Sequence, residues 1–499
     1  MFIVTAKEMY DVDRHAVDSI GYDGRILMEN AGRAISENMK SILSKHDQIC
    51  ILIGAGNNGG DGYVIARTLL NEAYSVNVVQ VVPDEKITGD VRYHKDIFVK
   101  CGGTLNIVST AEEAEKHVQS ASVIIDAMLG IGVKGALREP IQSIVSLINQ
   151  NAVKVIAVDI PTGLPSCEGV KEFQAIQADF TITIEAAKES AFIPHTAPYY
   201  GSIEIVKIGV PSQLFQMYTK KDTWEESDFK NTLPERNAFS HKGTHGKGLA
   251  IGGSKEMPGS IAMTAKAALR AGVGLVAIGT SEKVIQSIAS ACLEATFIEL
   301  PKDSTENVLQ YDNYDAVAIG MGLGREKQAY DYVQNSLKQA SCPLIIDADG
   351  LFHIKNNLDV LKDRSAATIL TPHPGEMAML MDCTIDEIVH APFAHAKKFS
   401  REYGVYVVLK GKYTIITTPA GKQTVNHKGN PGLAKGGSGD VLTGVILSMV
   451  MQNQSIEEAI CNACFLNGKA ADACIEEGHS YYDLLATDVI NGLPIVLRT

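Results

Sequence analysis

The sequence of 499 residues predicts two α/β domains, each a parallel sheet with helices on both faces. Short β-rich runs alternate with helical patterns along most of the chain, which is typical of βαβ units. The alternation gives way to polar residues between 212 and 235, where the only tryptophan, Trp224, lies. Each half also has its own glycine-rich loops. We therefore expect one three-layer α/β/α domain at 1–215 and a second at 225–499.

The first half opens with two predicted helices. Thr5 and Glu8 have the spacing of a capping box and predict the start of the first. The second is predicted from apolar residues at helical spacing, namely Leu27, Ala31, Ile35, Met39 and Ile42. Strands are then expected at Ile49–Ile53, Val76–Val82, Val123–Asp126, Val153–Asp159 and Phe180–Ile184. Their alternation with helical runs predicts a parallel sheet.

The second half repeats this pattern but ends differently. A strand at Leu249–Ile251 leads to a helix over Ser260–Ala271. Further strands are predicted at Leu275–Ile278, Ala316–Ile319, Leu344–Asp347 and Thr368–Leu370. Val405–Leu409 and Thr414–Thr417 have the spacing of a β-hairpin, and the remainder is predicted to be helical.

Composition and charge exclude several classes of function. Hydrophobic residues make up 45% of the chain and charged residues 21%, which is typical of a soluble globular protein. The net charge of −13 argues against binding to nucleic acid or to an anionic membrane surface. The N-terminus lacks the features of a signal peptide, and the apolar run at 441–451 is shorter than the ~20 residues of a membrane span. Nine scattered cysteines, with Cys461 and Cys464 expected in the core, suit a reducing compartment. A cytoplasmic protein is predicted.

A glycine-rich loop follows the first predicted strand. Residues 54–62 (Gly-Ala-Gly-Asn-Asn-Gly-Gly-Asp-Gly) contain the GxGxxG pattern of dinucleotide-binding folds. The acid that those folds place ~20 residues later is missing, because the next strand ends near Gln80 without one. A tight turn explains the glycines but not Asn57, Asn58 and Asp61 together. Their side-chain oxygens suit a cation or a carboxamide.

Two later strands end in an aspartate. Asp126 precedes a second glycine-rich loop, and Asp159 precedes Pro-Thr162-Gly. Ligands of open parallel sheets bind beyond the carboxyl ends of the strands, so Asn58, Asp126 and Thr162 are expected to converge and offer oxygens to a monovalent cation. Asp159 would remain for acid–base chemistry. A helix cap is the alternative for any one of these aspartates.

The motifs at 57–61, 126–132 and 159–163 resemble, in this order, the signature of the YjeF N-terminal family, the NAD(P)H-hydrate epimerases. The resemblance covers about residues 1–215 and implies a Rossmann-like fold that interconverts the R and S hydrates at C6 of the nicotinamide ring. It implies potassium at Asn58, Asp126 and Thr162, while the catalytic role of Asp159 rests on the acid–base chemistry expected above. The implied hydrate-binding residues are Asn57, Asn58, Gly59, Gly60, Asp61, Gly130, Ile131, Gly132, Val133, Lys134, Gly135, Ala136 and Asp159. Some relatives of this domain are binding scaffolds without catalysis.

A second glycine-rich stretch, 430–440, directly precedes a long apolar helical pattern. Free N–H groups and the helix dipole make such a helix N-terminus an anion site. A carboxylate at Asp440 would repel a resting phosphate, so we interpret it as the base for a hydroxyl group that attacks one. An N-cap aspartate after a glycine-rich turn is the alternative.

Four other features follow predicted strands in this half. Glycines at 320–325 would let the backbone approach a ligand closely. Two prolines fix the loop at 371–376, which presents a histidine for function or, equally, for packing. Two lysines in the glycine turn at 410–414 suggest a polyphosphate clamp or a charged hairpin tip. Asp347 and Asp349 end another strand, within reach of a magnesium ion through water.

Together these motifs resemble the carbohydrate-kinase-like branch of the ribokinase superfamily, and more narrowly the NAD(P)H-hydrate dehydratases, over about residues 225–499. Met321 stands where that family often has proline. The implied nucleotide contacts are Lys410, Gly411, Lys412, Tyr413, Thr414 and Gly439. The implied hydrate contacts are Ala238, Gly322, His373 and Asp440, of which Ala238 rests on its alignment position alone.

The resemblance implies a dehydration that passes through a phosphate ester. Hydroxide leaves the hydrated ring poorly and phosphate leaves well, so Asp440 would deprotonate the C6 hydroxyl for attack on ADP or ATP, bound with Mg²⁺. Elimination of phosphate would then restore NADH or NADPH. Bacterial fusions of this kind tend to use ADP, and relatives often assemble, so ADP and a homo-oligomer are expected.

A small-molecule kinase is the alternative function. The second half would then phosphorylate a vitamin precursor such as a hydroxymethylpyrimidine or a thiazole, and the first half would be a non-catalytic nucleotide-binding scaffold. A stable phosphorylated product would favour the kinase. Free phosphate with recovered absorbance of reduced nicotinamide would favour repair.

Overall fold

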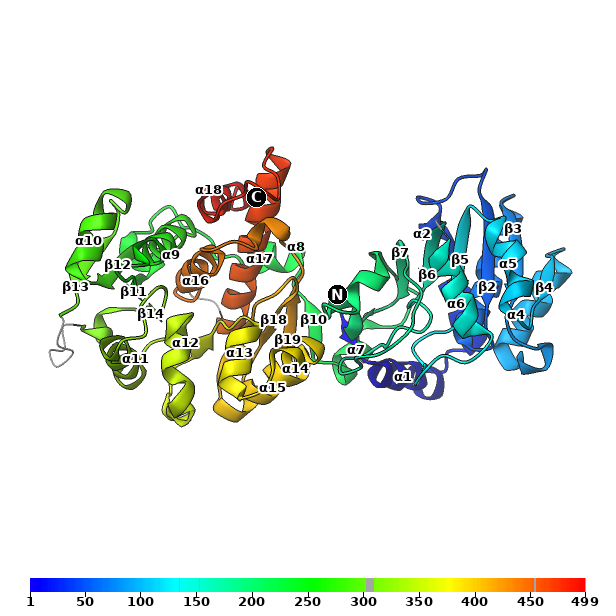
Figure 1. Ribbon diagram of the computed structural model, residues 1–499, viewed down its shortest axis with the longest axis horizontal. Coiled ribbons are helices and arrows are strands. Elements are labelled where there is room, and N and C mark those ends of the chain that lie inside the picture. Colours follow the sequence, from blue (N-terminus) through cyan, green and yellow to red (C-terminus); the bar gives the residue numbers. More distant parts are fainter. Residues whose placement is uncertain (134, 152, 302–308, 453–454, 499) are drawn as a thin grey trace. The chain divides into compact units, whose positions relative to one another are not determined.

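The computed structural model describes residues 1–133, 135–151, 153–301, 309–452 and 455–498. The chain divides into two compact units, Met1–Lys220 (unit 1) and Lys221–Thr499 (unit 2), each with its own main sheet (Figure 1). The predicted domain ends at 215 and 225 lie on either side of this division. The polar stretch around it is not irregular, because it forms a helix, a strand and a second helix.

Unit 1 contains a seven-stranded sheet whose neighbouring strands are all parallel, as predicted. In spatial order the strands are β4 (Leu105–Ile107), β3 (Ser75–Gln80), β2 (Gln48–Ile53), β5 (Val123–Ala127), β6 (Lys154–Val158), β7 (Phe180–Ile184) and β9 (Ser202–Val206). β4 and β9 were not predicted, because these edge strands are only partly buried and carry no continuous apolar run. A separate parallel pair joins β1 (Ile3–Val4) to β8 (Ala187–Lys188).

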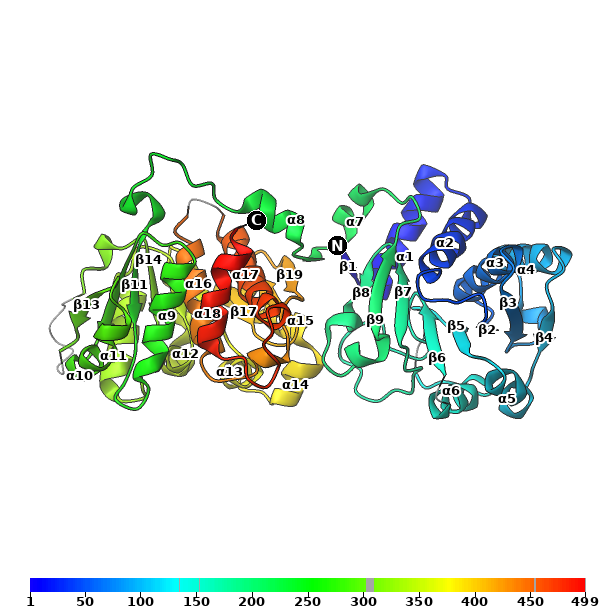
Figure 2. The ribbon, with the colours of Figure 1, turned by 90° about the horizontal axis from the view of Figure 1, so that it is seen from above.

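Helices cover both faces of this sheet, with α2, α3 and α4 on one face and α5 and α6 on the other (Figure 2). The helices of unit 1 are α1 (Ala6–Arg14), α2 (Gly24–Met39), α3 (Asn57–Asn71), α4 (Gly89–Lys100), α5 (Ala111–Gln119), α6 (Ile141–Gln150) and α7 (Ser212–Tyr218). A π-helical turn, His15–Ile20, continues α1, and short 3₁₀ turns lie at Asp84–Lys86, Glu189–Phe192 and Ala197–Tyr200.

The predicted capping box at the start of α1 is confirmed. The Glu8 amide donates to the Thr5 hydroxyl at 3.2 Å, and the Thr5 amide donates to the Glu8 carboxylate at 2.7 Å. Both N–H groups would otherwise lack an intrahelical acceptor. The box therefore fixes where α1 begins, and so which of its residues face the rest of unit 1.

Unit 2 contains a ten-stranded sheet that is parallel apart from its β17–β18–β19 region, where neighbours are antiparallel. In spatial order the strands are β10 (Lys221–Thr223), β19 (Gln423–Asn426), β18 (Thr414–Thr417), β17 (Tyr406–Leu409), β16 (Thr368–Leu370), β15 (Leu344–Ile346), β14 (Ala316–Ile319), β11 (Lys247–Ile251), β12 (Leu275–Thr280) and β13 (Thr296–Glu299). The predicted hairpin is β17–β18. The all-helical prediction for the remainder is wrong at β19, whose polar residues are buried and give no apolar signal.

Two helical layers enclose this sheet, with α9, α16, α17 and α18 over one face and α11, α12, α13 and α15 over the other (Figure 1). The helices of unit 2 are α8 (Glu226–Thr232), α9 (Pro258–Arg270), α10 (Glu282–Ile288), α11 (Lys327–Gln339), α12 (Asp349–Ile354), α13 (Pro374–Met381), α14 (Ile385–His390), α15 (Pro392–Tyr403), α16 (Ser438–Met449), α17 (Ile456–Glu476) and α18 (Ala486–Val496). Shorter 3₁₀ segments lie at Lys242–His245, Ala289–Ala291, Tyr311–Asn313, Lys355–Asp363 and Pro431–Leu433.

The core of unit 2 contains the cysteine pair expected there. Cys461 and Cys464 lie on α17, are buried, and are unbonded thiols. Trp224 is also buried, and its indole N–H donates to Asn462 at 2.9 Å. None of the helices in the described ranges combines the length and apolarity needed to cross a membrane.

Candidate active sites

In unit 1 the motif at 57–61 forms the first turn of α3, with Gly56 at the N-cap. A Cβ on Gly54 would overlap the Met128 carbonyl group, and one on Gly59 would overlap that of Gly54. Only glycine permits this approach, so the glycines bring the start of α3 against the loop after β5. The sequence predicted a loop over residues 54–62, but from Asn57 onward these residues form the start of α3.

Asn58, Asp126 and Thr162 converge around that loop. The Thr162 amide and hydroxyl groups each donate to an Asp126 carboxylate oxygen at 2.7 Å. The Thr162 hydroxyl accepts from the Leu129 amide at 2.9 Å, and the Asn58 carboxamide donates to the Leu129 carbonyl oxygen at 3.1 Å. Residues from the start of α3, the end of β5 and the loop after β6 therefore form one hydrogen-bonded group.

This group fits a monovalent cation. Burial raises the pKa of the Asp126 carboxyl to about 6, although hydrogen bonds from Thr162 oppose the rise. No Lys, Arg or His of the described residues forms an ion pair with Asp126, so its charge is uncompensated. Carboxylate, carbonyl and hydroxyl oxygens are hard ligands suited to alkali cations. In the described ranges no cluster of three or more His, Cys, Asp or Glu side chains could hold a metal ion.

Asp159 follows β6 with a left-handed backbone, φ 66°. Its Oδ1 accepts from the Lys188 ammonium at 2.6 Å, the Ile184 amide at 3.0 Å and the Thr183 hydroxyl at 3.1 Å. The Lys188 side chain is fully buried. Within the described part of the chain Oδ2 accepts no hydrogen bond, and Asp159 lines a cavity. One oxygen is held and the other is available to a ligand.

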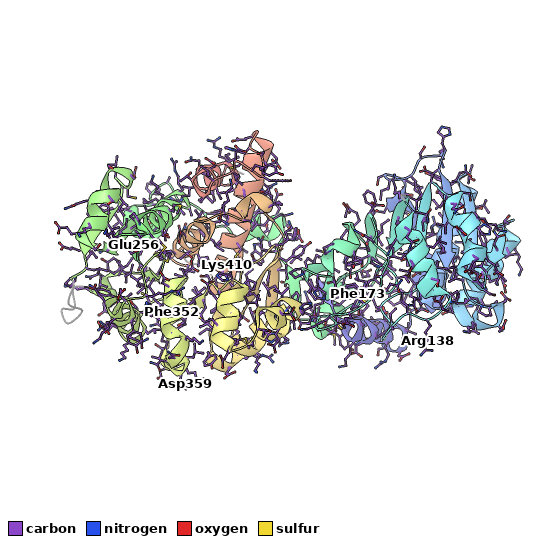
Figure 3. The ribbon with its side chains drawn as sticks, viewed as in Figure 1. Arg138, Phe173, Glu256, Phe352, Asp359 and Lys410 are labelled. Atoms are coloured by element: carbon purple, nitrogen blue, oxygen red, sulfur yellow. The ribbon has the colours of Figure 1, made fainter. Side chains whose placement is uncertain are left out.

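The cavity has a volume of about 760 Å³ and lies at this edge of the sheet. From the predicted set it is lined by Asn57, Asn58, Asp61, Gly130, Ile131, Gly132, Val133, Ala136 and Asp159. Gly60 packs α3 against α2, because a Cβ there would overlap Met28. Gly59 and Gly135 are not in the lining, and Lys134 lies outside the described residues. Arg138, labelled in Figure 3, also lines the cavity.

Sequence reasoning missed Tyr10, Asp13 and Lys188. The first two lie on α1 and line the cavity, and the third holds Asp159. Burial, and then the carboxylates of Asp159 and Asp13, raise the pKa of Asp61 well above its ordinary value. None of the three missed residues lies in a glycine motif, and only the fold brings them to the site.

In unit 2 the glycine-rich stretch leads into α16, whose N-cap is Gly437 with φ 91°. The amides of Gly439 and Asp440 donate to no acceptor among the described residues, so they are available to an anion. Asp440 is the third residue of the helix. Its interpretation as an N-cap is therefore wrong.

Asp440 is a half-buried acid. Burial raises the pKa of its carboxyl to about 6, and the Asp347 carboxylate adds to the rise. A hydrogen bond with Ser260 and the charge of Lys410 oppose it. Gly322 lies beside the same serine, because a Cβ at Gly322 would be 3.0 Å from the Ser260 Cβ. The predicted hydrate contacts Gly322 and Asp440 are thus linked through Ser260.

Lys410, labelled in Figure 3, lies beside the N-terminus of α16. A Cβ on Gly439 would be 3.4 Å from its Nζ. The ammonium donates to Asp347 Oδ1 at 2.8 Å and lies 3.9 Å from Glu376 Oε2. Burial lowers the pKa of Lys410, but these carboxylates outweigh it and the net shift is upward. Lys410 therefore keeps its positive charge at the anion site.

Asp347 supports Lys410 rather than binding a metal. Thr371 donates to its Oδ1 at 2.7 Å and Thr443 to its Oδ2 at 2.8 Å, so both oxygens are used. Asp349 accepts from the Gly324 amide at 2.9 Å. The Lys410 ammonium already neutralises Asp347, which argues against the suggested magnesium pair.

His373 caps α13, and its Nδ1 accepts from the amides of Gly375 and Glu376. Its Nε2 lies 3.6 Å from the carboxylate of Glu376, which in turn neighbours Lys410. The exposed ring therefore lies at the edge of the same cluster. Sequence reasoning did not single out Glu376 for this position.

The remaining predicted contacts lie further out. The Lys412 ammonium donates to the Gly429 carbonyl oxygen at 3.1 Å, which joins the β17–β18 turn to the start of the glycine-rich stretch. Tyr413 lies 5.9 Å from that ammonium, and the Thr414 hydroxyl closes the turn onto Gly411 at 3.4 Å. Ala238 lies in an exposed turn.

Comparison with known families assigns both halves. The profile described as NAD(P)H-hydrate dehydratase matches residues 249–494, and that described as YjeF-related protein N-terminus matches residues 24–190. α1 precedes the second matched range.

Whole proteins with both halves are similar to this chain. The bifunctional NAD(P)H-hydrate repair enzyme of Moorella thermoacetica is 34% identical, over 100% of this chain and 97% of its own length. That of Escherichia coli is 33% identical over 97% of this chain and 92% of its own. Among solved structures, the ADP/ATP-dependent NAD(P)H-hydrate dehydratase of Bacillus subtilis, co-crystallised with ATP and Mg²⁺, is 37% identical with a TM-score of 0.51. It covers 56% of this chain and 98% of its own.

Proposed function

The chain belongs to the bifunctional NAD(P)H-hydrate repair enzymes, and from this premise we propose which residues of its two units carry out the repair. Unit 2 dehydrates the S hydrate to NADH or NADPH with a phosphoryl group from ADP or ATP. Unit 1 converts the R hydrate into the S hydrate. Together the two units return both hydrates to the reduced nucleotide.

One observation carries the assignment of unit 2. Asp440 lies at the N-terminus of α16 beside a charged lysine, Lys410, and its own amide and that of Gly439 donate to no acceptor in the described ranges. The amides and the ammonium suit the transferred phosphoryl group, and the carboxylate suits the proton of an attacking hydroxyl group. This combination supports phosphoryl transfer to a hydroxyl.

The reaction begins when Asp440 takes the proton of the C6 hydroxyl group. The C6 oxygen attacks the terminal phosphorus of ADP, and the bond from that phosphorus to its bridging oxygen breaks, releasing AMP. The C6–O bond then breaks with its electron pair leaving on phosphate. Loss of a proton from the neighbouring ring carbon restores the dihydronicotinamide. ATP would release ADP in the same way.

The nucleotide is assigned to the turn Lys410–Thr414 and to Gly439. The position of Lys410 at the α16 N-terminus supports this assignment. Mg²⁺ would arrive on the nucleotide phosphates and neutralise their charge, since Asp347 and Asp349 are already engaged. We propose ADP as the preferred donor, which parallel rate measurements with ADP and ATP would test.

In unit 1 the hydrate is assigned to the 760 Å³ cavity, with the free Oδ2 of Asp159 as a proton acceptor. The uncompensated charge of Asp126, beside Asn58 and Thr162, supports a potassium site. When bound, potassium would neutralise Asp126 and stiffen the loop after β5. A homo-oligomer is also expected, and sedimentation would test it.

The direct test incubates the purified chain with NADHX epimers, Mg²⁺ and either ADP or ATP. We expect recovery of reduced-nicotinamide absorbance with one phosphate released per hydrate consumed. A stable phosphorylated product without that recovery would favour the small-molecule kinase. Spontaneous epimerisation, measured without protein, sets the baseline for unit 1.

A further inference from the structure

The cavity of unit 1 has a wall that none of the glycine motifs supplies. Met9, Tyr10 and Asp13 of α1, together with Val17 of the following turn, line it alongside Asn57, Asp61 and Asp159. Tyr10, Asp13 and Val17 are spaced i, i+3 and i+7, so they share one helix face. A Cβ on Gly132 would lie 2.8 Å from the Tyr10 hydroxyl group, which brings α1 to the loop after β5.

Asp13 is a half-buried carboxyl that the fold leaves without a partner. In the described part of the chain it takes part in no hydrogen bond and no ion pair. The nearest cations along α1 pair with Asp11 instead, which lies 3.5 Å from Arg14 and 3.9 Å from Lys7. A carboxyl in a cavity without a partner costs free energy. Such groups are candidates for function.

The charges that face Asp13 come from several elements. Burial raises the pKa of its carboxyl to about 6, and the Asp159 carboxylate adds to the rise. Glu185 acts in the same direction, and only Lys188 opposes it. The Asp13 carboxylate in turn adds to the raised pKa values of Tyr10 and Asp61.

Asp159 differs from Asp13 in its immediate surroundings. The buried Lys188 ammonium lies 2.6 Å from its Oδ1, whereas no cation among the described residues pairs with Asp13. Among the carboxyl groups that line the cavity, Asp159 is therefore supported by a positive charge, whereas Asp13, on a separate element, is not. Neighbouring carboxyl groups in unequal environments are suited to opposite roles as acid and base.

We propose that Asp13 is a second catalytic residue of the epimerase. It acts as the proton donor to the leaving oxygen, and Asp159 acts as the proton acceptor for the incoming water. This rests on the proposed epimerisation of the hydrate in unit 1. The two hydrates differ in which face of C6 carries the hydroxyl group. Interconversion therefore requires a bond at C6 to break and re-form from the other face.

The proposed step balances without an external oxidant or reductant. Asp13 donates its proton to the C6 hydroxyl oxygen as the C6–O bond breaks, and the electron pair leaves with oxygen as water. The ring nitrogen lone pair forms a C=N⁺ double bond to C6. Water adds to the other face, and its proton passes to Oδ2 of Asp159. Asp13 ends ionised and Asp159 protonated. The reverse reaction exchanges these roles, and solvent restores the protons.

The test uses the full chain and R-enriched NADHX. Epimerisation is followed through the chain's own unit 2, supplied with ADP so that the S hydrate is consumed as it forms. Asp13→Asn should slow turnover by at least ~100-fold, the scale of general acid–base catalysis, with KM little changed. Dehydration of pure S hydrate by the same protein should be unaffected.

Two further variants separate proton transfer from folding. Asp13→Glu keeps a carboxyl group and should recover part of the lost rate. Asp11 lies on the same helix in contact with Lys7 and Arg14, so Asp11→Asn is the matched control. Its epimerisation rate should stay within about twofold of that of the unsubstituted chain. The epimerisation rate should also fall as pH rises through about 6, and the remaining rate of Asp13→Asn should lack this dependence.

The possible outcomes are distinct. If the unsubstituted chain does not exceed spontaneous epimerisation, the proposed function of unit 1 fails and this inference fails with it. If that chain is active and Asp13→Asn is equally fast, only the inference fails. A raised KM with unchanged turnover in both Asp13 variants would make Asp13 a binding residue and overturn its role as proton donor. Retention of the original oxygen in heavy-oxygen water would overturn the C6–O step.

Discussion

The two sites use the same residue types, an aspartate and a lysine, in different arrangements. In unit 1 the buried Lys188 pairs directly with Asp159, the aspartate proposed to react. In unit 2 Lys410 pairs with Asp347, and Asp440 stands beside that pair. Three donors use one oxygen of Asp159, whereas the donors to Asp347 use both. Asp159 therefore keeps an oxygen available for reaction, whereas Asp347 serves as a support for Lys410.

The largest effect is expected from Asp440→Asn. Loss of the base should slow dehydration of S hydrate by at least ~100-fold while nucleotide binding persists. Nucleotide affinity from calorimetry and turnover from recovered absorbance would measure the two separately. Near-normal turnover in this variant would remove Asp440 from the mechanism.

Asp347→Ala should act on stability instead. It leaves the Lys410 charge buried without its main partner, which typically costs about 3–5 kcal/mol. Denaturant unfolding should show this loss in unit 2 and not in unit 1. Asp359→Ala, at an exposed pair with Lys362, is the matched control and should have no measurable effect. Unchanged stability of Asp347→Ala would contradict the supporting role.

Potassium should distinguish the two sites. Asp126→Ala should raise the potassium concentration needed for epimerisation by roughly tenfold or more, because Asp126 is the one carboxylate among the three proposed ligands. Replacing potassium by choline at constant ionic strength should slow the unsubstituted epimerase and leave the dehydration of S hydrate unaffected. Equal responses of both reactions would argue against a potassium site confined to unit 1.

The smallest effect is the pH dependence of unit 2. Asp440 must be ionised to act as a base, and its pKa is raised to about 6. The dehydration rate should therefore fall as pH falls, by about twofold at pH 6 and about tenfold at pH 5 relative to its plateau. A pure S hydrate assay over this range would measure it. A rate that stays constant down to pH 5 would mean that Asp440 titrates near its ordinary range or is not the base.

The sequence predicted the parallel sheets and the glycine-rich anion site because those signals are local. Apolar runs mark buried strands, and glycines directly before a helical pattern mark the start of α16. Asp13, Lys188 and Asp347 could not be assigned in this way. Lys188 and Asp347 act through partners distant in sequence, Asp347 through Lys410 across 63 positions, and Asp13 is brought to the cavity only by the fold. The buried polar strand β19 was missed for a related reason, since its burial depends on its neighbours.

We propose that one chain repairs both hydrates through two separate sites. The most direct measurement supplies an equal mixture of NADHX epimers with ADP and Mg²⁺ to three proteins, namely the unsubstituted chain, Asp159→Asn and Asp440→Asn. The unsubstituted chain should recover all of the reduced nicotinamide, Asp159→Asn should recover half quickly and the rest at the spontaneous rate, and Asp440→Asn should recover almost none. Full, rapid recovery by Asp159→Asn, or a stable phosphorylated product from the unsubstituted chain, would contradict the account.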